Sequence, residues 1–189
     1  MKRKNYRPGK PASVEARADG NRWTLVFVRE LRHPPAKVWQ ALTDPRELAK
    51  WAPFDPDRDL GTPGPAALTM AGGSAPEPPL PSTVVRAEAP KLLEYTWGED
   101  LLRWELAPTA SGTRLTLSHT MGDRTWLPKT AAGWQICLDV AEQALSGESI
   151  GRIVAGEAKD YGWEQLNADY AEQLGIENTG FPADDQKPS

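Results

Sequence analysis

The longest uninterrupted hydrophobic pattern of the chain lies in its second half. Apolar side chains recur at three- and four-residue spacing over residues 127–146, so they fall on one face of a helix. A helix of about 20 residues is roughly 30 Å long, and such a face needs a partner surface. Pro128 suits the first turn, and Gly147 suits the position just beyond the end. The stripe consists of Leu127, Thr130, Ala131, Trp134, Cys137, Leu138, Ala141 and Leu145.

Strand patterns precede this helix. Residues 13–18 and 22–31 flank Asp19-Gly20, a dipeptide that readily forms the tight turn of a hairpin. The second of these runs is apolar on both faces, which is typical of a covered strand. We expect a curved sheet around the long helix, with a concave space between them. Its further strands are predicted at residues 66–70 and, as an antiparallel meander, at residues 82–87, 91–97, 101–107 and 113–120.

Three more helices are indicated by the pattern. Residues 36–42 have helical spacing, and a second short helix begins at Pro45. Residues 163–174 form an amphipathic helix that we expect to pack on the long one. Between residues 52 and 81 the periodicity is largely lost while Pro and Gly accumulate, which predicts a loop at the mouth of the concave space.

Length and charge narrow the class of protein. The 189 residues predict one domain over residues 13–175, with a basic flexible tail at 1–12 and a second flexible tail at 176–189. The net charge is −4, and five of the 22 basic residues lie in the first ten positions, so the remainder is acidic. An acidic body repels phosphates, which argues against nucleic acid as a partner.

Other classes are excluded by what the sequence lacks. No apolar run approaches the roughly 20 residues that span a bilayer, and the basic start leads into polar sequence, so we expect no membrane insertion and a cytoplasmic location. The single Cys137 cannot form an internal disulfide and has no companions for a zinc site. We expect it in the core.

The order of these elements is the α+β helix-grip arrangement: a curved antiparallel sheet around a long C-terminal helix, two short helices after the early strand, and an extra C-terminal helix. Residues 13–175 also resemble the SRPBCC (START-like) superfamily, and within it the bacterial stand-alone relatives of the C-terminal domain of the heat-shock-protein ATPase activator. The resemblance is carried by RELRHPPAKVWQALTDPRELAKWAPFDPDRDLG, LRWELAPTASGTRLTLSHTM and AAGWQICLDVAEQAL. Its most specific piece is Pro35-x-x-Val38-Trp39-x-Ala41-Leu42-Thr43-Asp44-Pro45.

This resemblance implies fold more firmly than activity. It implies a hydrophobic cavity between the sheet and the long helix, which members of the superfamily use to hold lipids, sterols, polyketides and other apolar molecules. The eukaryotic activator also carries a separate N-terminal domain that stimulates the chaperone, and nothing in this chain resembles that domain. A chaperone partner is therefore an alternative rather than the primary expectation.

The sequence contains few candidates for catalytic, metal-binding or cofactor-binding residues. The acids at Asp55, Asp57 and Asp59 alternate as in a calcium loop, but the glycine and the final glutamate of that motif are absent, so we expect no metal. No phosphate loop or other cofactor motif is present. His119 alternates with the inward Leu117, which makes it either a hydrogen-bonded core histidine or a polar anchor for a ligand. No nucleophile, base and orienting group can be assembled around it.

The primary hypothesis is a non-enzymatic carrier or sensor that encloses a small apolar or aromatic ligand. One alternative is an enzyme of the cyclase, dehydratase or hydrolase kind that uses His119 as acid or base. A second is an interaction protein, chaperone-associated or homodimeric, whose own tryptophans fill the interior. Aromatic walls with few polar groups are typical of apolar ligand sites. The predicted ligand-binding residues are Trp51, Phe54, Met70, Trp97, Trp104, His119, Met121, Trp134 and Leu138.

Overall fold

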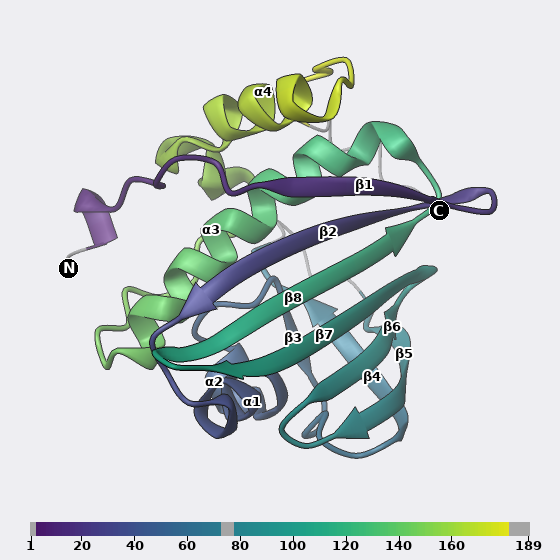
Figure 1. The fold of residues 1–189 in the computed structure, drawn as a ribbon, viewed down its shortest axis with the longest axis vertical. Helices are drawn as coiled ribbons and strands as arrows, with labels where there is room; N and C mark the ends of the chain where they lie inside the picture. The colour runs from purple at the N-terminus through teal and green to yellow at the C-terminus, as the bar shows by residue number, and fades with distance from the viewer. Residues whose placement is uncertain (1–2, 73–77, 182–189) are drawn as a thin grey trace.

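The computed structural model describes residues 3–72 and 78–181 and has an α+β architecture (Figure 1). One sheet, in the spatial order β1-β2-β8-β7-β6-β5-β4-β3, curls around the long helix α3, and every pair of neighbouring strands is antiparallel. This arrangement confirms the predicted helix-grip fold. The strands are β1 (Val14–Asp19), β2 (Arg22–Leu31), β3 (Phe54–Pro56), β4 (Gly64–Met70), β5 (Leu80–Glu88), β6 (Leu92–Trp97), β7 (Asp100–Thr109) and β8 (Gly112–Met121).

The helices lie on one side of this sheet and at its end. α1 and α2 follow β2, α3 follows β8 across the concave face, and α4 packs against both α3 and β1 (Figure 1). The described residues contain the α-helices α1 (Pro35–Thr43), α2 (Pro45–Leu48), α3 (Leu127–Leu145) and α4 (Trp163–Leu174), and the 3-10 helices η1 (Arg3–Asn5), η2 (Arg124–Trp126) and η3 (Ala155–Tyr161).

Local signals explain where the helices begin and end. The Asp44 side chain accepts a hydrogen bond from the Arg46 amide at 2.8 Å, and Pro45 follows it, so α2 has a capped start. α3 ends just before Gly147, whose φ of 83° a residue with a side chain rarely adopts. Because α3 is buried on nearly its whole circumference, both of its faces need partners.

The register of the strands decides which side chains face α3. Across β2 and β8, Leu25 lies opposite His119, and Trp23 lies opposite Met121. On the other side of β8, Leu102 of β7 lies opposite His119. Directly opposed residues share one face of a sheet. His119 therefore sits in the middle of the concave face, with a leucine on either side.

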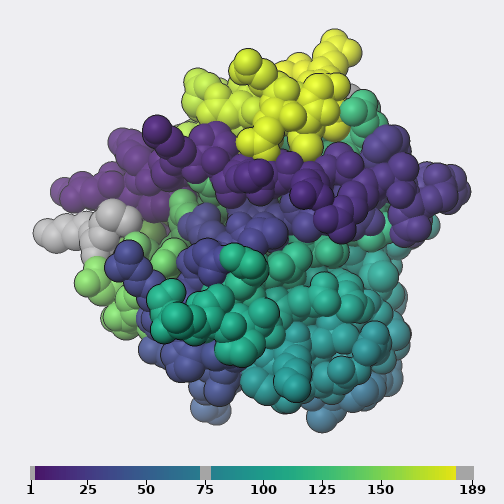
Figure 2. Space-filling model, viewed as in Figure 1, coloured from purple at the N-terminus to yellow at the C-terminus, as the bar shows by residue number. Residues whose placement is uncertain are grey.

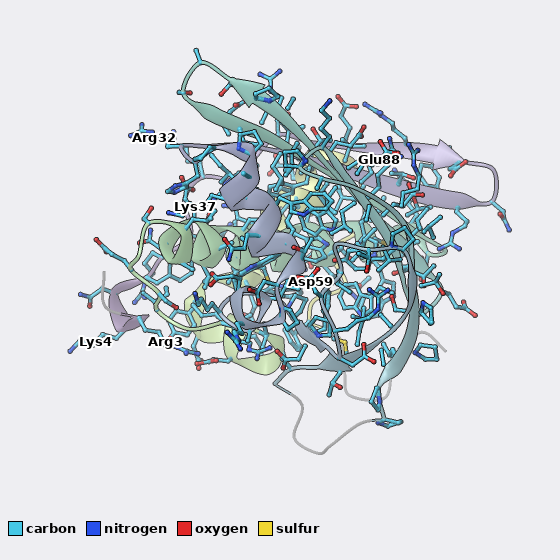
Figure 3. The ribbon with its side chains drawn as sticks, turned by 90° about the horizontal axis from the view of Figure 1, so that it is seen from below. Arg3, Lys4, Arg32, Lys37, Asp59 and Glu88 are labelled. Atoms are coloured by element: carbon cyan, nitrogen blue, oxygen red, sulfur yellow. The ribbon has the colours of Figure 1, made fainter. Side chains whose placement is uncertain are left out.

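The N-terminal segment differs from the flexible tail expected over residues 1–12. Residues 3–12 lie along the body next to α3 and α4 (Figure 2), and Arg3 and Lys4 project from η1 at the edge of the molecule (Figure 3). Tyr6 is only 2% exposed, and its hydroxyl donates to Asp139 of α3 at 2.7 Å. The physical reason is that α3 carries polar groups on its outer face, and the segment supplies their hydrogen-bond partners. Residues 1–2 lie outside the described residues.

The chain after α4 also packs where a free tail over 176–189 was expected. Phe181 packs edge to face against Trp163, with ring centroids 4.8 Å apart, and Asn178 accepts a hydrogen bond from Asn167 at 2.7 Å. Aromatic burial outweighs the polar composition of this segment. Residues 182–189, which belong to the same expectation, lie outside the described residues.

β3 is the one strand that the pattern did not indicate, because it falls in the region expected to be a loop. It has three residues, which is too short for a recognisable alternation. Its pairing with β4 sets Phe54 opposite Met70. Pro56 is tolerated because β3 is an edge strand. The pairing brings Phe54 to the concave face, where the candidate site lies.

Candidate ligand site between the sheet and α3

Large aromatic rings from separate elements meet between the sheet and α3. Trp97 of β6 and Trp104 of β7 both contact Trp134 of α3, with ring centroids 5.9 and 5.3 Å apart. Trp51, just after α2, lies 6.2 Å from Trp104, and Phe54 lies 5.3 Å from Trp97. All four contacts are edge to face, a geometry that contributes about 0.5–1.5 kcal/mol per pair beyond the burial of area. The rings therefore fill the middle of the interior.

The indole N–H groups of this cluster have partners of unequal strength. Trp97 donates to the sulfur of Met70 at 3.4 Å, and a thioether is a weak acceptor. Trp97 and Met70 are also the partly exposed members of the predicted set, whereas the other tryptophans of the cluster are buried. The firmer bonds join Trp51 to the Ala41 carbonyl (3.1 Å), Trp104 to the Tyr95 hydroxyl (3.2 Å) and Trp134 to the His119 ring (3.0 Å).

His119 is held at both ring nitrogens. The Trp134 indole can only donate, so Nδ1 of His119 accepts and the ring hydrogen is on Nε2. That hydrogen points to Asp100, whose carboxylate oxygen lies 2.9 Å away. Arg22 reaches the other oxygen of Asp100 at 3.4 Å. With 2% of its surface exposed, His119 has no nitrogen left for a substrate, so the site offers no free histidine as acid or base.

The structure thus brings most of the predicted residues into one cluster. Met121 is buried and lies 3.9 Å from the Thr130 hydroxyl, and Leu138 is buried one helical turn after Trp134. Two hollows of the described surface, of about 540 and 630 Å³, are lined by none of the predicted residues. The residues in mutual ring contact are Trp51, Phe54, Trp97, Trp104, His119 and Trp134.

Sequence reasoning missed two polar partners of the site. Asp100 falls between the predicted strands 91–97 and 101–107, although it alternates with Leu102 and Trp104 on the inward face of β7. Tyr95 lies within the predicted strand 91–97, but it was not counted as a partner for an indole. Alternation could have found both residues, but their partners become visible only when the strands are aligned.

The interior is electrically neutral away from Asp100. Burial raises the pKa of the Tyr95 hydroxyl well above its usual range, so this group stays protonated. Burial likewise raises the pKa of the Cys137 thiol to about 12. A neutral interior lined by indole rings can stack an apolar or aromatic molecule and can offer few hydrogen bonds.

The acidic residues of the calcium-like motif bind other groups of the protein. Asp57 accepts from the Ala67 amide at 2.9 Å, and the Asp55 carboxylate pairs with Arg152 at 2.8 Å. Across residues 3–72 and 78–181, no group of three or more histidine, cysteine or acidic side chains is placed to hold a metal ion. Within the same ranges, no helix is both long and apolar enough to cross a membrane.

Comparison with known structures supports the fold. A conserved protein of unknown function from Enterococcus faecalis is 20% identical, with a TM-score of 0.66 over 88% of this chain and 93% of its own. The crystal structure of CalU16 from Micromonospora echinospora is 18% identical, with a TM-score of 0.63 over 86% and 96%. An AHSA1-like protein from Aeromonas hydrophila is 22% identical, with a TM-score of 0.56 over 67% and 94%.

The family follows from a separate comparison. No curated protein matches the chain. The family described as "Activator of Hsp90 ATPase homolog 1-like protein" matches residues 32–146, which extend from the end of β2 through all of α3. This match spans more than half of the chain and contains every residue of the aromatic cluster. The chain therefore belongs to the Activator of Hsp90 ATPase homolog 1-like family.

Proposed function

We propose that this protein binds a small apolar or aromatic molecule between the sheet and α3 and acts as a carrier or sensor. The observation that carries the proposal is the placement of Trp97. Its indole lies at the partly exposed end of the aromatic cluster, and its N–H donates only to the weak thioether acceptor of Met70. The family to which the chain belongs fits a ligand-binding role.

Rotation of Trp97 would open the site at little cost in hydrogen bonding. Its ring contacts His119 at 5.7 Å and Trp134 at 5.9 Å between centroids. Moving the ring away uncovers these two faces, and a flat apolar ligand can take its place. His119 and Trp134 stay fixed because each is hydrogen-bonded to a partner on another element. In this proposal the Trp97 side chain moves to admit the ligand, and the remaining rings line the site.

The first experiment is native mass spectrometry of the protein purified under mild conditions, to detect a retained small molecule. The second is a titration with N-phenyl-1-naphthylamine, a neutral apolar fluorophore. We expect saturable binding of one molecule per chain. Trp97→Ala is expected to raise the affinity about tenfold, because an apolar space of ring size readily takes up aromatic molecules.

A matched control distinguishes this effect from general loosening. Trp39 of α1 is also a partly buried tryptophan, and among the described residues it has no ring contact with the cluster. We expect Trp39→Ala to leave the affinity for the fluorophore unchanged. The proposal is wrong if neither the native chain nor Trp97→Ala binds the fluorophore and mass spectrometry detects no retained molecule.

A second candidate is a chaperone-associated interaction protein, which the close filling of the interior by tryptophan rings favours. A protein with a filled core would act through its surface. The test is the ATPase rate of an Hsp90-type chaperone with and without this chain. This candidate predicts a higher rate that Trp97→Ala leaves unchanged, whereas the primary proposal predicts no change in the rate.

A further inference from the structure

One buried hydroxyl of the interior leaves its hydrogen unused. Among the described residues three tyrosines are buried, and two of them, Tyr6 and Tyr170, donate to side chains of α3. The hydroxyl of Tyr95, which is 1% exposed, accepts from the Trp104 indole at 3.2 Å but has no acceptor for its own hydrogen in the described part of the chain. Burial raises the pKa of Tyr95, so the hydroxyl keeps this hydrogen. Buried donors are normally paired, so this one needs an explanation.

Tyr95 borders the place that Trp97 occupies. The two side chains alternate on the concave face of β6. Phe54 contacts both rings, with its centroid 6.2 Å from Tyr95 and 5.3 Å from Trp97. On the other side, Trp104 donates to the Tyr95 hydroxyl and contacts Trp134. Trp134 in turn contacts Trp97. These five residues form a closed circuit of contacts, so a molecule that replaces the Trp97 ring completes the same circuit as the hydroxyl.

The other polar groups around this circuit are already bonded. The indole N–H groups of Trp51, Trp104 and Trp134 each have an acceptor. Both ring nitrogens of His119 have partners, and Met70 offers only a weakly accepting sulfur. An ionised ligand would lose its hydration among these rings at a high cost. A neutral ligand with a hydrogen-bond acceptor therefore fits the unused donor best.

We infer that the ligand is a neutral aromatic molecule with an acceptor oxygen, such as the carbonyl of a ketone or an ester, and that Tyr95 donates to this oxygen. This inference rests on the proposed function and names the class of its ligand. Tyr95 is then the residue that determines specificity. A site built to donate to an oxygen discriminates against an analogue without it, because the analogue leaves the buried donor unpaired.

Two naphthalenes of nearly equal shape test this hydrogen bond. 2-Acetylnaphthalene carries a C=O group where 2-isopropenylnaphthalene carries a C=CH2 group. Each is titrated as a competitor of N-phenyl-1-naphthylamine, and the ratio of their dissociation constants gives the preference for the ketone. We expect Tyr95→Phe to lower this preference about fivefold, the usual worth of one neutral hydrogen bond. The comparison of ratios cancels the different hydration of the probes and any general loosening of the site.

A second pair of variants removes the influence of Trp104. In Tyr95→Phe the indole N–H of Trp104 loses its acceptor and becomes free to donate to the carbonyl instead. Trp104→Phe and the double variant Trp104→Phe/Tyr95→Phe differ only in the hydroxyl, so we expect the same decrease of about fivefold between them. A preference that is equal across both pairs of proteins would overturn the inference.

A measurement on the native chain needs no variant. Infrared spectroscopy of bound 2-acetylnaphthalene reports the carbonyl stretch, which a hydrogen bond shifts to lower frequency. We expect a frequency below that of the ketone dissolved in hexane, and a return toward the hexane value in Trp104→Phe/Tyr95→Phe. A hexane-like frequency in the native chain would show that no donor reaches the carbonyl, and the inference would be wrong.

The chain offers a matched control for the loss of a buried hydroxyl. Tyr170 is also buried, but its hydroxyl donates to Gln135 and accepts from the Ala12 amide on the outer face of α3. Tyr170→Phe should leave the preference for the ketone unchanged. An equal decrease in Tyr170→Phe and Tyr95→Phe would mean a general loosening of the fold and would contradict a specific role of Tyr95.

Failure of this inference differs from failure of the proposed function. If N-phenyl-1-naphthylamine binds and the preference for the ketone does not depend on the Tyr95 hydroxyl, the inference is wrong and the apolar site stands. If neither the fluorophore nor either naphthalene binds to the native chain or to Trp97→Ala, the proposed function itself fails, and this inference fails with it.

Discussion

The two faces of α3 are both buried, but they are satisfied in different ways. On the inner face, Trp134 meets rings and a histidine that strands hold in fixed positions. On the outer face, the Gln135 amide donates to the carbonyls of Gly9 and Lys10, both at 3.2 Å. The inner face is thus closed by side chains of the sheet, and the outer face by α4 together with the extended segment before β1.

This difference suggests a division of tasks. In the proposed function, the Trp97 ring of the inner face can be exchanged for an apolar ligand, because its indole loses only the weak hydrogen bond to the sulfur of Met70. The outer face has no such freedom, since Tyr170 and Gln135 bond to each other and both contact the Ala12 amide. A buried polar group left without its partner costs about 1–3 kcal/mol. We therefore expect the inner face to bind the ligand and the outer face to stabilise the fold.

The largest effect is expected from Trp134→Ala on the inner face. Truncation of a buried tryptophan lowers the free energy of unfolding by about 3–5 kcal/mol, and here it also leaves Nδ1 of His119 without its donor. Urea denaturation followed by circular dichroism measures the loss. A decrease below about 1 kcal/mol would mean that Trp134 borders an open space rather than a filled interior.

Removal of residues 1–12 tests the outer face and should have the next largest effect. It exposes the surface that Tyr6 covers and leaves Asp139 and Gln135 without the partners that this segment supplies. We expect the free energy of unfolding to fall by roughly 3 kcal/mol, the sum of one aromatic burial and the unsatisfied Gln135 amide, since Asp139 keeps its ion pair with Arg29. An unchanged denaturation midpoint would show that the segment does not support α3.

A pair of hydroxyl deletions compares the faces directly. Tyr95→Phe on the inner side removes one hydrogen-bond acceptor, and Tyr170→Phe on the outer side removes a hydroxyl that donates to Gln135 and accepts from Ala12. We expect a loss of about 1 kcal/mol for Tyr95→Phe and about 2 kcal/mol for Tyr170→Phe. The reverse order in matched urea titrations would contradict the proposed division of tasks.

The last prediction concerns stability at alkaline pH and has the smallest effect at neutral pH. Burial raises the pKa of Cys137 from 9.0 to about 12 and that of Tyr170 from 10.0 to about 12. Because the neutral forms are favoured in the folded state, this stabilisation is complete below pH 9.0 and is lost as the pH rises toward about 12. The urea midpoint should fall over this window. In Cys137→Ala the fall should begin about one pH unit higher, near the ordinary pKa of tyrosine.

Much of the fold was predictable because periodicity marks the face that an element buries. The apolar stripes of residues 127–146 and 163–174 predicted α3 and α4 with ends that differ by at most one residue. The alternation around His119 placed it on the inward face, as the structure has it. The three residues of β3 escaped detection, since so short a run shows no period.

The polar partners of the site could not be predicted in this way. Tyr6 and Asp139 are separated by 133 positions, and nothing local in either segment indicates that they meet. Asp100 was hidden by a turn composition that resembles any other hairpin. The basic N-terminal segment was expected to be solvated, because its charges were judged from the local sequence alone. The polar groups on the outer face of α3 need hydrogen-bond partners only once the helix is buried in the fold.

The sequence by itself determined the strands other than β3, the four α-helices, their inward faces and the gathering of aromatic residues between the sheet and α3, because spacing along the chain sets which side chains point together. Only the tertiary structure decided how the interior is filled and which groups satisfy one another. Hydrogen bonds such as those of His119 with Trp134 and Asp100 join residues that come close only when the strands are in register.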